Sequence, residues 1–107
     1  MVNSINDDEI WNIIGFIRIS SARYITLEIL QTQYAIPSDI VEMTKLTPAQ
    51  VSSALKELKE KKLIKCMNDT ATKGRIYHTT PLGEKSYKMV NEYLLKDNHH
   101  HQKSFLK

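Results

Sequence analysis

The spacing of apolar residues predicts two helices in the first third of the chain. Between positions 7 and 19, apolar side chains recur at steps of three and four residues, which places them on one face of a helix. Three acidic residues at its start suit the positive end of the helix dipole. A second helix is predicted to run to about Gln33 from Ser20 or Ser21, because either serine can cap it.

A third helix is predicted after a short extended segment at residues 34–36. Pro37 disfavours the helical conformation for the residue before it, and so separates this segment from the third helix. Ser38 is expected to cap the new helix with its hydroxyl group, and the helix is expected to run to about Lys45. Leu46 is then left in a tight turn.

The sharpest local signal is the sequence Thr47-Pro48-Ala49-Gln50. It combines a capping residue, a proline at the first helical position and a glutamine three residues after the cap, which is the pattern of a capping box. The helix that it begins should end near Lys61 or Lys62 and bury a single apolar stripe. This stripe and the apolar residues of the preceding helix are spaced so that the two helices pack across the turn as a helix-turn-helix.

The last third of the chain predicts a β-hairpin and one more helix. Residues 63–68 and 75–79 are rich in strand-forming side chains and are separated by a polar loop. Thr80 and Pro81 repeat the order of cap and proline, and helical spacing of apolar residues comes after them. Beyond Asp97 no such pattern continues.

Length and composition indicate one folded domain. A chain of 107 residues with 41% hydrophobic and 25% charged residues can build a single core, which we assign to residues 1–97, with 98–107 as a disordered tail. No apolar run approaches the roughly 20 residues of a membrane span, and residues 1–8 lack the features of a signal segment. We therefore expect a cytoplasmic protein without membrane contact. Its one cysteine excludes an internal disulfide.

The positive charge is concentrated in one part of the chain. The net charge is +3, but residues 56–75 alone carry seven Lys and Arg against three Asp and Glu. Such a local excess is typical of a surface that binds a polyanion.

Several stretches of the sequence resemble the winged helix-turn-helix transcriptional regulators of archaea and bacteria, in the broad MarR-like and ArsR-like group. They are residues 37–41, 46–52, 55–64 and 73–83 within a region from about Ser20 to Lys85. The resemblance implies a mainly α fold with a small β-hairpin, in which residues 47–62 form the recognition helix and 69–75 the wing. It also implies a sequence-specific regulator that binds double-stranded DNA.

The residues that we expect to contact DNA lie on the helix-turn-helix and the wing. They are Ser38, Thr47, Gln50, Ser52, Ser53, Lys56, Lys73 and Arg75. Gln50 is equally accounted for by its place in the capping box, and Arg23 by either a phosphate contact or an ion pair. Tyr77 and His78 lie on opposite strand faces, one expected in the core and one at the surface.

The sequence departs from the group at three positions. Lys45 and Lys62 stand where glycine is frequent, so both are expected to adopt an uncommon backbone conformation, and Ser53 stands where arginine is frequent. Because a serine-rich recognition helix weakens the case for base recognition, the alternative is a winged helix that binds a protein partner without binding DNA.

A homodimer is expected because one small helix-turn-helix unit rarely binds DNA tightly enough alone. The apolar residues in excess of the needs of one core are expected to form its interface. They are Trp11, Phe16, Tyr93, Leu94 and Leu95.

Enzymatic activity, cofactors and metal sites are not expected. The sequence has no phosphate-binding glycine loop and no nucleophile elbow. His99-His100-His101 lacks the spacing of a structured metal site, and Cys66 is expected to be a packed side chain rather than a redox sensor.

Overall fold

The computed structural model describes residues 7–97, with side chains up to position 93. The described part of the chain has five helices and one hairpin, as the sequence predicts. They are α1 (Asp7–Arg18), α2 (Ser21–Thr32), α3 (Pro37–Met43), α4 (Pro48–Glu60), β1 (Ile64–Cys66), β2 (Tyr77–Thr79) and α5 (Pro81–Asp97). The predicted tail, residues 98–107 with its histidines, lies outside the described residues. No helix within 7–97 is long and apolar enough to cross a membrane.

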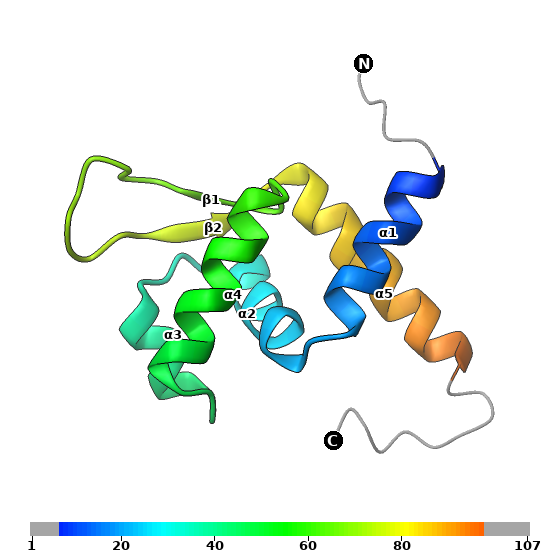
Figure 1. The fold of residues 1–107 in the computed structure, drawn as a ribbon, viewed down its shortest axis with the longest axis horizontal. Coiled ribbons are helices and arrows are strands. Elements are labelled where there is room, and N and C mark those ends of the chain that lie inside the picture. Colours follow the sequence, from blue (N-terminus) through cyan, green and yellow to red (C-terminus); the bar gives the residue numbers. More distant parts are fainter. Residues whose placement is uncertain (1–6, 98–107) are drawn as a thin grey trace.

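Helix α2 is the centre of the fold, because it packs against α1, α4, α5 and β2. Figure 1 shows α3 and α4 at the end of the molecule from which the hairpin projects, with α1 and α5 at the other end. The core between these elements is formed by one side of each amphipathic helix. Its fully buried large side chains include Ile17, Leu27, Leu30, Ile40, Val51, Leu58, Leu63, Ile64 and Val90.

Helix starts agree with the predicted capping residues, with one exception. The Ser20 hydroxyl accepts from Arg23 N–H (3.2 Å), and the Thr80 hydroxyl accepts from Gly83 N–H (3.0 Å). The predicted cap at Ser38 is wrong: α3 begins at Pro37, and no side chain caps it. Proline already has the helical φ and lacks the N–H that a cap would satisfy, so it takes the first helical position and leaves Ser38 inside the first turn.

The turn between α3 and α4 is closed by Thr44 rather than by a left-handed residue. Its hydroxyl donates to Ile40 C=O (2.8 Å) and accepts from Leu46 N–H (3.1 Å). The expectation of an uncommon conformation at Lys45 is therefore wrong. The Thr44 side chain bridges the turn, so Lys45 does not need a positive φ. At the end of α4 the same expectation is confirmed, since Lys62 has φ 64°.

The hairpin is shorter than predicted. Its strands pair antiparallel in the register Ile64 with Thr79, Lys65 with His78 and Cys66 with Tyr77. The predicted ends at Asn68 and Arg75 lie in the loop instead, because the Asn68 side chain accepts the Ile76 N–H (2.7 Å) where a strand would offer a backbone carbonyl.

Tyr77 and His78 lie on opposite faces of β2, as predicted, although both are half-buried. Tyr77 packs against the core, whereas the His78 ring stacks on the exposed ring of Tyr34, with 4.1 Å between ring centroids. Tyr77 also pairs with Ala35, which joins the extended segment after α2 to the hairpin.

Candidate nucleic-acid interface

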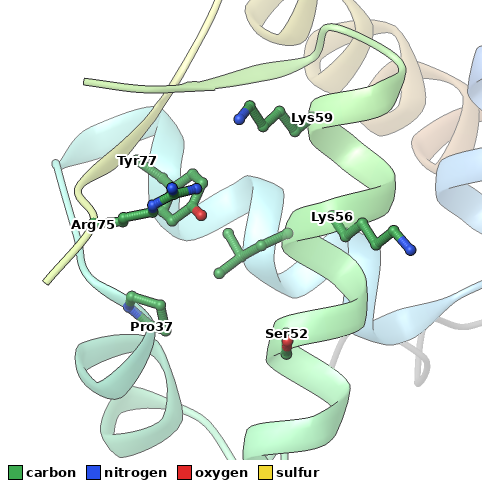
Figure 2. Close-up of a pocket in the computed structure, with 7 residues that line it drawn as sticks. Pro37, Ser52, Lys56, Lys59, Arg75 and Tyr77 are labelled. Atoms are coloured by element: carbon green, nitrogen blue, oxygen red, sulfur yellow. The ribbon is translucent and has the colours of Figure 1, made fainter. Parts of the chain in front are cut away.

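A groove of about 270 Å³ lies between α4 and the hairpin. Figure 2 shows Arg75 extending from the hairpin toward α4, and Lys59 extending from α4 toward the hairpin. The groove is lined by Pro37, Ser52, Leu55, Lys56, Lys59, Arg75 and Tyr77. Three of these seven residues are cations and none is acidic, so the groove favours an anionic ligand.

The polar side of α4 borders this groove and is not covered by the rest of the described chain. Its apolar stripe is buried in the core, as predicted, at Val51, Ala54, Leu55 and Leu58. The predicted contact residues on its other side are exposed: Gln50, Ser52, Ser53 and Lys56. This helix of 13 residues therefore presents its polar side to solvent.

The start of α4 is fixed by the predicted capping box. The Thr47 hydroxyl accepts from Gln50 N–H (3.1 Å), and Gln50 Oε1 accepts from Thr47 N–H (2.9 Å). Two of the free backbone N–H groups of the helix start are satisfied in this way. Gln50 thus has the capping role, one of the two that the sequence allowed, and its side chain stays exposed.

The hairpin loop is organised by Asn68. Its amide oxygen accepts from Ile76 N–H (2.7 Å), its amide nitrogen donates to Gly74 C=O (3.1 Å), and its backbone C=O accepts from Ala71 N–H (2.9 Å). This residue was missing from the residues predicted to form the site. The signal that could have found it was the preference of asparagine for turns in which its side chain binds nearby backbone groups.

Arg75 and Lys73 occupy different positions on this loop. Arg75 is half-buried, and its Nε donates to Ala71 C=O (2.8 Å), so its remaining guanidinium N–H groups can bind another acceptor. Lys73 is exposed beside Gly74, whose φ of 65° makes the sharp turn at the tip. The loop therefore carries one cation toward the groove and one at its outer end.

An ion pair joins α4 to the loop. Lys59 Nζ lies 3.2 Å from Asp69 Oδ1 on the exposed surface. The hydrogen bond and charge of Lys59 hold the pKa of the Asp69 carboxyl below its ordinary value, so the carboxylate is ionised at neutral pH. Lys59 was missing from the predicted contact residues because its alternation with glutamates is typical of a solvated helix surface.

No protein-family model and no curated protein sequence matches the chain. Several solved structures match it in fold. TubR from Bacillus thuringiensis serovar israelensis, solved bound to 24 bp of tubC, has a TM-score of 0.69 at 16% identity, over 86% of this chain and 99% of TubR. The MarR family regulator SP03579 has a TM-score of 0.67 at 18% identity, over 82% of this chain and 60% of that one. A PadR family regulator from Clostridium difficile has a TM-score of 0.61 at 20% identity, over 82% of this chain and 100% of that one.

The chain has the winged helix-turn-helix fold of MarR-like regulators. In this fold α3 and α4 are the helix-turn-helix, α4 is the helix in the position of the recognition helix, and residues 67–76 form the wing. The fold predicted from the sequence is confirmed, and the wing is longer than the predicted 69–75 because the paired strands are shorter.

Arg23 lies in an ion pair rather than at a free surface. Its Nε donates to Glu57 Oε1 (3.0 Å), and its guanidinium also donates to Phe16 C=O (2.8 Å). The pair connects α2 to α4. Of the two roles that the sequence allowed, the structure provides the ion pair.

The residues predicted to form a dimer interface are only partly together. Trp11 and Tyr93 contact each other edge to face between α1 and α5, with 5.9 Å between ring centroids, and 54% of Trp11 is exposed. Phe16 makes different contacts: the Arg23 guanidinium and the Lys61 ammonium lie over its ring. The side chains of Leu94 and Leu95 lie outside the described residues.

Within the described residues, no group of three or more His, Cys, Asp and Glu side chains is arranged to hold a metal ion. Cys66 is half-buried, and its thiol lies 3.5 Å from Asn68 Oδ1 at the base of the wing.

Proposed function

We propose that this protein is a transcriptional regulator that binds double-stranded DNA, with the recognition helix α4 in the major groove and the wing along the phosphate backbone. The observation that carries the proposal is the exposed polar side of α4 beside a groove lined by Lys56, Lys59 and Arg75. A major groove about 12 Å wide admits one helix, and the adjacent cations lie where the flanking phosphates would pass.

The roles of the contact residues are set by their positions. Lys73 and Arg75 bind phosphates, because both are basic residues of the hairpin loop, Arg75 beside α4 and Lys73 at the outer end. Ser52 and Ser53 lie on the exposed side of α4, where their hydroxyl groups reach base edges or phosphates. Ser38 in the first turn of α3 and Thr47 at the start of α4 lie close to the backbone of the duplex.

One of the similar structures supports the same partner. TubR was solved bound to 24 bp of tubC, and its chain aligns with this one over almost its whole length. The two chains share their fold, with a TM-score of 0.69. We carry the partner, double-stranded DNA, from that complex to this chain as part of the proposal.

The proposed regulator is a cytoplasmic homodimer that binds a site with two related halves, because two recognition helices are needed for useful affinity. The exposed ring of Trp11, held against Tyr93, is the apolar surface that supports an interface between α1 and α5 of two chains. Size-exclusion chromatography with light scattering tests this part. Trp11→Glu should give a monomer, whereas Met67→Glu, an equally drastic change on the exposed wing, should not.

Fluorescence anisotropy with labelled fragments of genomic DNA tests the proposed function. Binding should weaken about tenfold or more between 50 and 200 mM salt, because each neutralised phosphate contributes about −0.9 to the slope of log affinity against log salt. Absent or salt-insensitive binding would contradict a DNA-binding role and leave the winged helix as a protein-binding module.

A further inference from the structure

Gln50 is an exposed side chain whose amide group is oriented by the capping box at the start of α4. Its oxygen accepts the Thr47 backbone N–H (2.9 Å), and the assignment of oxygen and nitrogen is unambiguous, because a backbone N–H can only donate. The amide nitrogen therefore carries two N–H groups that the capping box does not use.

The position of Gln50 places this amide where bases are read. It is the third residue of the recognition helix, and side chains at the start of such a helix contact base edges in the major groove. Ser52 and Ser53 beside it can either donate or accept, so their hydroxyl groups select weakly between bases. Gln50 is thus the residue in this turn with a fixed hydrogen-bonding sense.

We propose that Gln50 reads one base pair through its amide nitrogen alone and thereby selects guanine. This inference rests on the proposed function. Glutamine commonly reads adenine with both amide atoms, its oxygen accepting from N6 while its nitrogen donates to N7. Here the oxygen is turned to the Thr47 backbone N–H at the start of the helix, which leaves the amide nitrogen to donate to a base.

The base preference is set by the edges of the four bases in the major groove. Guanine presents two adjacent acceptors, N7 and O6, to a donor. Adenine and thymine each present one acceptor, and the adenine acceptor lies beside an amino group that opposes a second donor. Cytosine presents only an amino group, which the Gln50 nitrogen cannot bind. The expected order is guanine first, adenine and thymine next, and cytosine last.

Gln50→Glu separates the two tasks of the residue. Glutamate at this position still accepts from Thr47 N–H and favours the positive end of the helix dipole, so the helix start is retained. It has no donor, however, and should select cytosine at the same position. Ala49→Glu is the matched control, since it adds the same charge in the same turn and leaves Gln50 intact.

Selection of binding sites from a random DNA library, with the wild type and both variants, tests the proposal. The wild type and Ala49→Glu should share a guanine that Gln50→Glu replaces with cytosine, without change elsewhere in the site. Replacing this guanine with adenine should weaken wild-type binding about fivefold or more, and 7-deazaguanine should weaken it as well.

Three outcomes would overturn the inference. An adenine at this position that requires both its amino group and N7 would show two-atom reading. An unchanged site with Gln50→Glu would show that the residue only caps the helix. Equal binding to all sequences would leave DNA binding intact but remove base selection by Gln50, whereas a wild type that binds no DNA overturns the proposed function itself.

Discussion

Lys59 Nζ and Asp69 Oδ1 lie 3.2 Å apart and join the recognition helix to the wing. The pair places a carboxylate on the surface that is proposed to meet phosphates. In the proposed complex, Asp69 would repel DNA and would also occupy a lysine that could otherwise bind it.

Asp69→Asn should increase DNA affinity about threefold and make the salt dependence steeper by about one ion, because Lys59 is released to bind a phosphate. Anisotropy titrations at several salt concentrations measure both quantities. Asp8→Asn, which removes the same charge from exposed α1, should change neither. Weaker binding by Asp69→Asn would mean that the ion pair serves mainly to hold the wing in place.

Tyr24 and Tyr87 join α2 to α5 and should make the stability of the protein sensitive to alkaline pH. Tyr24 donates to Asn91 Oδ1 (2.6 Å), Tyr87 donates to Glu28 Oε2 (2.9 Å), and the two rings stack. Burial raises the pKa of both hydroxyl groups above the ordinary value of 10.0. The folded state keeps protons that the unfolded state loses, so stability is full below pH about 10 and falls above it.

Tyr24→Phe should lower the free energy of unfolding at pH 7 by about 1 kcal/mol, through the lost hydrogen bond to Asn91. The variant should also lose less stability than the wild type between pH 9 and 11, since phenylalanine has no hydroxyl group that could ionise. Urea denaturation at these pH values measures the difference. Parallel alkaline curves for the two proteins would be inconsistent with this account.

Gly83 is required by the packing of α5 against Leu63, just before β1, and Thr79, at the end of β2. A Cβ at this position would collide with Leu63 C=O and the Thr79 hydroxyl. Gly83→Ala should therefore cost about 1–3 kcal/mol and lower Tm by about 5 °C or more. Gly15→Ala is the control: its Cβ meets nothing within 4 Å, and alanine favours the exposed middle of α1. Equal melting temperatures for Gly83→Ala and the wild type would contradict the collision.

Local signals in the sequence predicted most of the fold. The capping box at Thr47 and the cap at Thr80 were recognisable because each depends on residues within one turn. Ser38 misled the prediction because proline competes for the same helix start. Lys45 misled it because the side chain of its neighbour Thr44 closes the turn.

The site was less predictable, since it depends on contacts across the chain. The sequence places Arg75 at the boundary between the wing and its second strand, but the orientation of its side chain toward α4 depends on its hydrogen bond to Ala71. The pairing of Lys59 with Asp69 likewise requires that the wing fold back beside the recognition helix. Sequence spacing gives the elements that carry these cations, and the packing of the hairpin against α4 gives their arrangement.

The most direct test measures the DNA affinity of two double variants at moderate salt, each of which lacks one pair of basic residues. Lys73→Ala with Arg75→Ala removes two charges from the wing, and Lys85→Ala with Lys88→Ala removes two from exposed positions of α5. The wing variant should lose about tenfold or more in affinity and about two units of salt slope, whereas the α5 variant should stay within about twofold of the wild type. Equal losses in the two variants, or none in the wing variant, would contradict the assignment of the interface.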